Sequence, residues 1–275
     1  MSFTTADVVK LRKVTGAGMM DCKNALNDAE GNFDRALEII REKGKLVASK
    51  RADRDAAEGV VLAKVTGDSK FGAMVVLNCE TDFVAKNENF IAFAAGILNL
   101  ALENNSASLD DVKALELDGR TVENQVTEQT GVIGEKIELS YFNSISAATV
   151  ISYIHPGNKL ATLVGFNKDG VENQVAKDVA MQVAAMAPVA IDKDSVPAEV
   201  VAKELEIAKE KYRQEGKPEA MLDKIAQGAL NKFFQESTLL NQTYVKDGKI
   251  SIKEFLSQSD KSLTVTSFDR YTLNA

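Results

Sequence analysis

The spacing of the apolar residues changes near residue 58, and this change constrains the fold more than any other feature of the chain. Before it, apolar side chains recur every three or four residues, which is the spacing of amphipathic helices. After it, they alternate with their neighbours, which is the spacing of β-strands. The change predicts an α+β protein with a helical domain over residues 1–44, a polar linker over 45–57 and a sheet-containing core from residue 58.

The helical domain is expected to contain three short helices. In the first, Thr5 can cap the helix, which stops at Gly16. The second stops at Gly31, and the third runs from Asn32 to Gly44. The apolar faces consist of Val8, Leu11 and Val14; Cys22, Ala25, Leu26 and Ala29; and Phe33, Ala36, Leu37 and Ile40. Because the caps and stops agree with the helical spacing, these residues indicate a three-helix domain.

The core begins with a β-hairpin and contains a second hairpin of related sequence. Apolar residues alternate on both sides of Gly67-Asp68-Ser69-Lys70, and again on both sides of Pro156-Gly157-Asn158-Lys159. At an offset of 89 positions the two hairpins share the identities Val61/Val150, Lys70/Lys159, Val75/Val164 and Asn78/Asn167. The match of turns, strands and identities predicts two copies of one subdomain.

Each hairpin is followed by a helix, and further strands are placed to complete two antiparallel sheets. The first helix has an apolar face of Phe90, Phe93, Ile97 and Ala101. The second is expected over Val171–Met186, and the additional strands near Glu138–Phe142 and Leu263–Phe268. These elements divide the core into a first subdomain over residues 58–144 and a second over 145–275.

A long helical insertion is predicted in the second subdomain at about residues 198–236. Its apolar residues follow the spacing of a coiled-coil seam, and Gly216-Lys217-Pro218 stops one helix and starts the next. The seam residues are Val201, Leu205, Ala208 and Tyr212, then Leu222, Ile225, Ala229 and Phe233. The charged residues on the other faces favour a protruding antiparallel hairpin over two ordinary core helices.

Residue types that most catalytic and metal sites need are scarce. The chain has one histidine, His155, and two cysteines, Cys22 and Cys79, which lack the C-x-x-C spacing of a zinc motif. The segment Gly16-Ala17-Gly18 follows a helix and lacks the third glycine of a dinucleotide-binding loop. None of the 40 acidic residues stands out as half of an acid–base pair. We therefore expect no catalytic residue, no metal site and no cofactor.

Charge and apolar runs indicate a cytoplasmic protein. Two free thiols suit a reducing compartment, no signal segment is visible at the N-terminus, and the apolar run Phe90–Leu102 is too short to cross a membrane. The net charge of −7 argues against nucleic-acid binding. The basic run Lys50, Arg51, Arg54 is interrupted by acidic residues and is interpreted as a solvated linker. We expect a protein that acts by contacting another protein, without nucleic acid or membrane.

Met19 and Met20 stand together at the start of the second predicted helix. So small a domain has room for only one of them in its core. Exposed methionine is common at adaptable protein contacts, although loosely packed surface methionines also occur without function. Residue type alone leaves both interpretations open.

The segment Asn78–Lys86 leaves the first hairpin toward a helix and carries Phe83. One interpretation is structural: Asp82 caps the helix and Phe83 packs into the core. The corresponding stretch of the second copy, residues 169–177, contains no aromatic residue. The fold therefore does not require phenylalanine here, which favours a functional role for Phe83.

Taken together, these segments resemble the bacterial elongation factor Ts family. The similarity runs from about residue 4 to residue 270, and it is most specific in Thr15–Lys23 (T-G-A-G-M-M-D-C-K) and Thr81–Val84 (T-D-F-V). Ile133-Gly134-Glu135 and Ser152–His155 also match. The resemblance implies a ubiquitin-associated-like three-helix domain, a core of two related α+β subdomains and an inserted helical hairpin. The residues alone lead to the same parts.

The resemblance also implies a function: a guanine-nucleotide exchange factor, not an enzyme, that binds elongation factor Tu in its GDP-bound and nucleotide-free forms and promotes GDP release. The implied contact residues are Thr81, Asp82, Phe83 and Val84 at the partner's magnesium and phosphate site; Arg12, Met19 and Met20 beside its nucleotide-binding domain; and Ile133, Gly134 and His155 in the core, with His155 facing a β-domain of the partner.

Two other functions stay open at this point. A ubiquitin-associated-like adaptor would bind its partners through residues 1–44 alone and would not need an exposed Phe83. An acid–base hydrolase would need a carboxylate pair with perturbed pKa values in a pocket. The sequence also leaves open whether the chain forms a homodimer and what the helical hairpin contacts.

Overall fold

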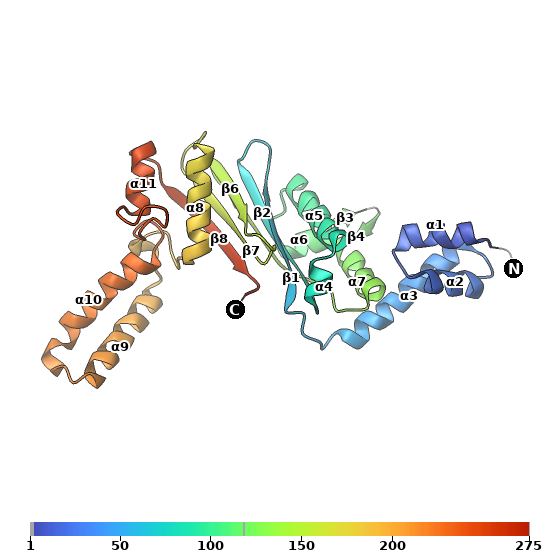
Figure 1. Cartoon of the computed structure of the whole chain (residues 1–275), viewed down its shortest axis with the longest axis horizontal. Helices are drawn as coiled ribbons and strands as arrows, with labels where there is room; N and C mark the ends of the chain where they lie inside the picture. Colours follow the sequence, from blue (N-terminus) through green and yellow to red (C-terminus); the bar gives the residue numbers. More distant parts are fainter. Residues whose placement is uncertain (1–2, 118, 275) are drawn as a thin grey trace.

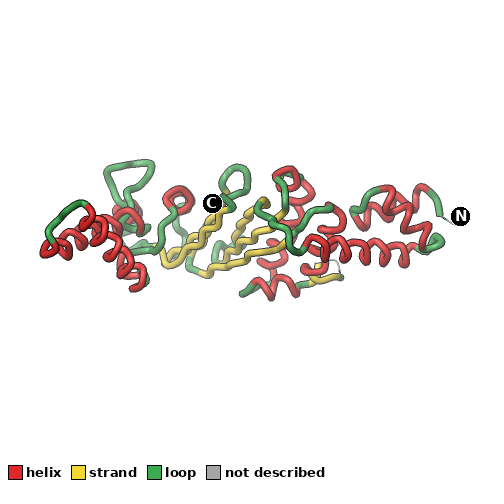
Figure 2. Tube along the Cα trace, turned by 90° about the horizontal axis from the view of Figure 1, so that it is seen from below, coloured by secondary structure: helices red, strands yellow, loops and turns green. Residues whose placement is uncertain are grey.

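The computed structural model describes residues 3–117 and 119–274 and is elongated (Figure 1). The helical domain lies at one end, two β-sheets with flanking helices lie in the middle, and a helical hairpin projects at the other end (Figures 1 and 2). The combination of helices with antiparallel sheets confirms the predicted α+β class.

The N-terminal helices are α1 (Thr5–Thr15), α2 (Met19–Asp28) and α3 (Phe33–Arg51). Their shared core consists of Val8, Leu11, Ala17, Cys22, Ala25, Leu26, Ala29 and Ala36. Two details differ from expectation. Thr4, not Thr5, caps α1, because the Thr4 hydroxyl accepts the Asp7 N–H and the Asp7 carboxylate accepts the Thr4 N–H. Val14 is exposed and lies outside this core.

Helix α3 does not stop at Gly44, as expected from the sequence, but continues to Arg51. The backbone at Gly44 is helical and lacks the positive φ that ends many helices. Glycine serves close packing here: it faces Gly131 of α7 (Val122–Ile133), where a Cβ atom would lie 2.2 Å from the Gly44 Cα. Residues 45–51, expected to be linker, are therefore the last turns of a helix that packs on the core.

Two three-stranded antiparallel sheets form the core. The first consists of β1 (Glu58–Val65), β2 (Phe71–Cys79) and β5 (Glu138–Ser146), in that order. The second consists of β6 (Thr149–Ile154), β7 (Leu160–Phe166) and β8 (Val265–Thr272), also in that order. In each, a hairpin pairs through its second strand with a strand that arrives after intervening helices. The predicted hairpins and third strands are confirmed, and the shared strand order supports the internal repeat.

The two sheets stack face to face, which gives the core four layers: helix, sheet, sheet and helix (Figure 1). The covering helices are α5 (Glu88–Glu103), α6 (Leu109–Ala114) and α7 on the first sheet, and α8 (Asn173–Met186) on the second. Between the sheets, Val61 of β1 belongs to the same buried cluster as Val150 and Leu163. Both faces of the hairpin strands are thus covered, which is why β2 is apolar almost throughout.

The predicted helical insertion consists of α9 (Ala198–Gln214) and α10 (Glu219–Ser237), which form an antiparallel hairpin (Figures 1 and 2). The buried residues along it are Ala208, Leu222, Ala226 and Leu230. Across the turn, Arg213 pairs with Glu219 at 2.8 Å. The smaller elements are α4 (Asp82–Ala85), β3 (Glu116–Leu117), β4 (Arg120–Thr121), the 3-10 helix η1 (Lys193–Ser195) and α11 (Ile252–Ser259).

Candidate functional site

A single helical turn, α4, follows β2 and presents Phe83 to solvent. Thr81 caps the turn, because its hydroxyl accepts the Val84 N–H at 3.4 Å. Ala85 is buried and Val84 packs against the core, whereas Phe83 is 84% exposed. Among the described residues this is the highest exposure of any large apolar side chain. One face of α4 therefore anchors the turn, and the other displays an aromatic ring that the fold does not use.

The structural interpretation of this segment is wrong on two points. Phe83 does not pack into the core. Asp82 is not the cap but the first residue of the turn, which begins one residue earlier than expected. Its carboxylate accepts a hydrogen bond from the Lys86 ammonium at 2.6 Å, and this bond lowers the pKa of Asp82. Threonine and aspartate are both common caps, so the choice between Thr81 and Asp82 is not visible in the sequence.

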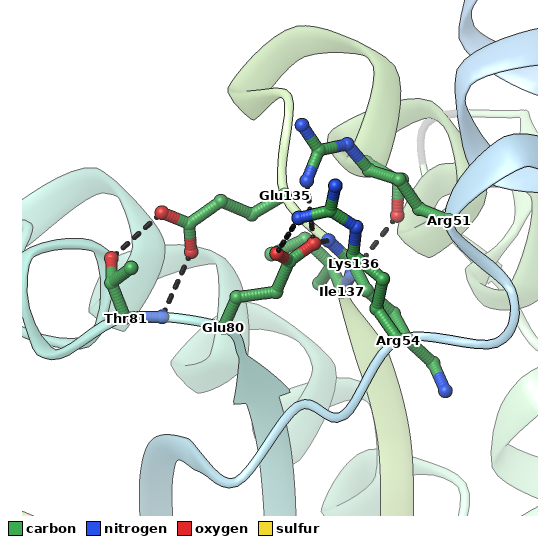
Figure 3. A network of polar contacts seen from close by, with 8 residues as sticks. Arg51, Arg54, Glu80, Thr81, Glu135, Lys136 and Ile137 are labelled. Atoms are coloured by element: carbon green, nitrogen blue, oxygen red, sulfur yellow. Dashed lines mark hydrogen bonds and ion pairs between the residues drawn. The ribbon is translucent and has the colours of Figure 1, made fainter.

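Glu135, which follows α7, fixes the turn from a distant part of the chain (Figure 3). Its carboxylate accepts hydrogen bonds from the Thr81 N–H at 3.0 Å and from the Thr81 hydroxyl at 2.7 Å. Gly134 ends α7 with a φ of 80°, a conformation that favours glycine, and this change of direction precedes Glu135. Ile133, the last residue of α7, packs against the same core as Val84. The predicted residues Ile133 and Gly134 thus lie in the support of the turn.

Glu80 is the second carboxylate beneath α4, and it receives three donors (Figure 3). The Lys136 N–H donates to it at 2.6 Å, Arg51 at 2.7 Å and Arg54 at 3.2 Å. The Lys136 N–H, with help from the two guanidinium groups, lowers the pKa of Glu80. The Glu80 side chain is only 14% exposed and that of Arg51 28%, so this pair is largely shielded from water. Arg51 and Arg54 are therefore not a free basic linker, as the sequence suggested, but a connection between α3 and the turn.

The supporting residues Glu80, Glu135, Arg51 and Arg54 were not expected to belong to the site. Glu80 lies in the segment Asn78–Lys86, and Glu135 is the last residue of the matching motif Ile133-Gly134-Glu135, so both belong to segments that the sequence had marked without giving these two side chains a role. Their partners, however, lie 26 to 56 positions away in the sequence. Such pairings depend on the packing of α3 and α7 and leave no local signal.

Cys79, at the end of β2, is part of the support and not a nucleophile. Its thiol is buried and donates to the Thr81 carbonyl at 3.1 Å. Burial, followed by the nearby Glu135 charge, raises the pKa of Cys79 to about 12. The thiolate form needed for nucleophilic attack is therefore rare at neutral pH.

The turn between β6 and β7 brings the second subdomain close to α4. Lys159 in this turn pairs with Glu58 at the start of β1, at 2.8 Å, and its charge also lowers the pKa of Asp82. His155 begins the same turn, is exposed, and exchanges a hydrogen bond with the Tyr153 hydroxyl at 3.0 Å. The structure therefore places His155 at the same end of the core as Phe83.

Arg12 belongs to α1, and Met19 and Met20 begin α2, so all three lie on the helical domain and not on α4. All three are exposed, with Met19 at 37% and Met20 at 65%. Neither methionine belongs to the buried core of the domain, although the sequence left room for one of them there. The contact residues expected from the sequence thus occupy two surfaces, one on the helical domain and one around Phe83.

The described residues offer little to support covalent chemistry. Within them there is no cluster of three or more histidine, cysteine or acidic side chains that could hold a metal ion. Every carboxylate among them whose pKa is displaced has a lowered pKa, and a general acid would need a raised one. In the same part of the chain, no helix has the length and apolar character needed to span a bilayer.

Comparison with known proteins gives a consistent result. The family described as Elongation factor TS matches residues 80–275. Elongation factor Ts of Porphyromonas gingivalis is 52% identical over 276 residues, which covers 100% of both chains. The Azobacteroides pseudotrichonymphae protein of the same name is 51% identical over 274 residues, 100% of this chain and 99% of the relative. That of Christiangramia forsetii is 52% identical and covers 98% of each. The similarity therefore includes the helical domain, both sheets and the helical hairpin.

Proposed function

The chain belongs to the elongation factor Ts family, the nucleotide exchange factors of translation elongation, and on this basis we propose that it binds elongation factor Tu carrying GDP and promotes release of the GDP. No covalent step is involved. The protein acts by binding one state of its partner more tightly than another. The decisive contact is the insertion of Phe83 beside the partner's magnesium and phosphate site.

The observation that carries this proposal is the exposure of Phe83 on an anchored turn. Phe83 is 84% exposed, while Thr81 next to it is held at both its N–H and its hydroxyl by Glu135. Moving an apolar ring from water into an apolar contact is favourable, and burial of a phenylalanine side chain stabilises a complex by about 1.5–3 kcal/mol. Because the turn is already ordered, little of that gain is spent on fixing a flexible loop.

To accelerate exchange, the burial of Phe83 must stabilise mainly the state of the complex from which GDP leaves. A contact made equally well in all states would only tighten binding. A ring that enters the partner beside its magnesium ion satisfies the requirement if the ring and the bound ion compete for the same space. Asp82, next to Phe83 in the chain, adds a partly exposed carboxylate that is paired with the Lys86 ammonium at 2.6 Å. Thr81 and Val84 support the turn: Thr81 caps it, and Val84 packs against the core.

The other proposed contacts hold the partner in position. Arg12, Met19 and Met20 contact its nucleotide-binding domain, and His155 contacts a β-domain. One feature of the structure supports separate roles for the holding contacts and for Phe83: the helical domain and the end of the core that carries Phe83 are separate exposed surfaces on one elongated molecule (Figure 1). Binding energy from the outer contact can then be used to drive Phe83 into place.

The proposal is tested with the whole chain and elongation factor Tu loaded with a fluorescent GDP. Addition of the chain should accelerate GDP release. By thermodynamic reciprocity, GDP with magnesium should also dissociate a preformed complex of the chain with nucleotide-free partner. A complex that withstands saturating GDP and magnesium, or a release rate unchanged by the chain, would contradict the proposal.

An adaptor that acts only through the helical domain is less well supported. The domain is not loosely attached, because α3 packs on α7 at Gly44 and Gly131 and ends in the ion pair between Arg51 and Glu80. An adaptor also has no use for Phe83, so it predicts that changes at Phe83 leave the partner's GDP release unaltered.

A further inference from the structure

We propose that Glu80 is a positioning residue: with Arg51 it holds the Phe83-bearing turn α4 at a fixed place relative to α3, and so couples docking of the helical domain to insertion of Phe83. This inference rests on the proposed function of Phe83. It adds a mechanical link between two surfaces that are separate in the fold.

The first step in the argument is that α3 spans both surfaces. Its early residues, including Ala36, belong to the core of the helical domain, and its last residue, Arg51, reaches Glu80. A helix of 19 residues is about 28 Å long, so α3 connects the core of the helical domain directly to Glu80.

The second step is that α3 is held in the middle as well as at its end. Gly44 lies against Gly131 of α7 so closely that a Cβ atom on Gly131 would be 2.2 Å from the Gly44 Cα. Arg41 of α3 also pairs with Glu128 of α7 at 3.4 Å. The two helices therefore cannot slide past one another without breaking close contacts.

The third step is that both helices end at the same turn. From α3, Arg51 donates to Glu80; from the segment after α7, the Lys136 N–H donates to Glu80 and Glu135 accepts from Thr81 (Figure 3). Helices α3 and α7 therefore contact each other, and α3 and the segment after α7 are each also hydrogen-bonded to the segment that begins α4. Hydrogen bonds between charged groups are the strongest of the common polar contacts and are directional, so they suit a joint that must keep its geometry.

Arg51 rather than Arg54 is the main partner in this joint. The Arg51 side chain is 28% exposed and lies 2.7 Å from Glu80, whereas Arg54 is 60% exposed and lies at 3.2 Å. Exposed ion pairs contribute little, because water and salt screen them. We therefore expect Arg51 to dominate the coupling.

The test is a double-mutant cycle with the full chain and elongation factor Tu loaded with fluorescent GDP. Arg51→Met should lower the maximal stimulated release rate roughly 10- to 150-fold, as expected for loss of a charged hydrogen bond, while affinity for the nucleotide-free partner falls less. If Arg51 acts through Phe83, the double variant Arg51→Met/Phe83→Ala should release GDP no more slowly than Phe83→Ala alone. Glu80→Gln, which keeps the size of the side chain, should behave as Arg51→Met, and Arg51→Lys should recover part of the rate.

Arg213→Met provides the matched control, because Arg213 also joins two elements through a carboxylate, but in the α9–α10 hairpin. It should leave the release rate unchanged. Multiplicative effects of Arg51→Met and Phe83→Ala, or a normal rate in both Arg51→Met and Glu80→Gln, would overturn the coupling. The single variant Phe83→Ala tests the proposed function separately: if it is slow while Arg51→Met is normal, the Phe83 mechanism stands and only the positioning role of Glu80 fails.

Discussion

Glu135 accepts hydrogen bonds from both the N–H and the hydroxyl of Thr81, at 3.0 and 2.7 Å, although the two residues are 54 positions apart in the chain. Thr81 is also the cap of α4, so a single carboxylate fixes the start of the turn that displays Phe83. The ring is therefore presented by an ordered element, not by a loop that must fold when the partner arrives.

Glu135→Ala should loosen α4 without unfolding the protein. Each hydrogen bond to a charged group contributes about 1.5–3 kcal/mol, so loss of both should make local opening of the turn much more frequent. Cys79 reports on the loss of Glu135 in two ways: its buried thiol donates to the Thr81 carbonyl, so opening exposes it, and burial together with the Glu135 charge raises its pKa to about 12, so the lost charge also makes the thiolate easier to form. Alkylation of Cys79, followed by peptide mass spectrometry, should be at least about 10-fold faster in the variant.

Glu138→Ala is the control for this experiment, because Glu138 lies three residues further on and its exposed side chain pairs with the Lys136 ammonium at 3.3 Å and not with Thr81. It should leave Cys79 as slow as in the wild type. Equal alkylation rates in Glu135→Ala and the wild type would show that the turn does not depend on Glu135.

Gly131→Ala should destabilise the protein, although alanine is normally the better residue in a helix. The added methyl group would approach the Gly44 Cα to 2.2 Å, and overpacking of this kind costs about 1–3 kcal/mol. Gly96→Ala in α5 is the matched substitution, since its Cβ would meet no atom within 4 Å. There the helix propensity of alanine should raise stability by up to about 1 kcal/mol. Urea unfolding of both variants measures the difference, and a neutral Gly131→Ala would mean that α3 and α7 can separate freely.

Replacement of both Met19 and Met20 by glutamate should weaken binding to elongation factor Tu while leaving the domain helical. Neither side chain belongs to the buried core, so folding should survive, whereas a charge placed in an apolar contact is strongly unfavourable. Met221→Glu, at a methionine of similar exposure in the α9–α10 hairpin, is the control. Titration calorimetry and circular dichroism measure the two properties. Normal affinity in the double variant would remove these methionines from the interface.

The contribution of Glu80 to stability should depend on pH in a defined direction. The Lys136 N–H, Arg51 and Arg54 lower the pKa of Glu80 below its ordinary value of 4.5. A carboxylate with a lowered folded-state pKa stabilises the protein above its ordinary pKa and loses that effect as pH falls through the folded-state pKa. The difference in unfolding free energy between the wild type and Glu80→Gln should be constant above about pH 5.5 and shrink in more acidic solution. A difference that grows on acidification, measured by urea unfolding at each pH, would contradict the pairing.

Much of the fold was predictable because local signals and spacing agreed. The two hairpins, the strands that complete the sheets and the α9–α10 insertion all followed from alternation, turns and stops in the sequence. Gly44 shows the limit. Glycine ends α1 at Gly16 with a positive φ, yet at Gly44 the same residue type allows two helices to touch. The sequence of α3 alone does not distinguish the two uses, because the reason lies in Gly131.

In the candidate site, too, one part was predictable from the sequence and another was not. The exposure of Phe83 was indicated by the second copy of the subdomain, which lacks an aromatic residue at the corresponding stretch. Its support was not predictable: Thr81 and Asp82 are equally plausible caps, and Glu135 and Arg51 reach the turn from distant elements. A single sequence shows which residue is unusual, whereas the contacts that hold it depend on packing.

The most direct test of the mechanism is stopped-flow release of fluorescent GDP from elongation factor Tu with Phe83→Ala, alongside thermal unfolding of the variant. Loss of about 1.5–3 kcal/mol of burial in the releasing state corresponds to stimulated release that is roughly 10- to 150-fold slower. Because Phe83 is 84% exposed, the melting temperature should hardly change, and Ile207→Ala on the α9–α10 hairpin should alter neither property. Slow release by a fully stable Phe83→Ala protein is the predicted result; normal release by that stable protein would contradict the insertion of Phe83.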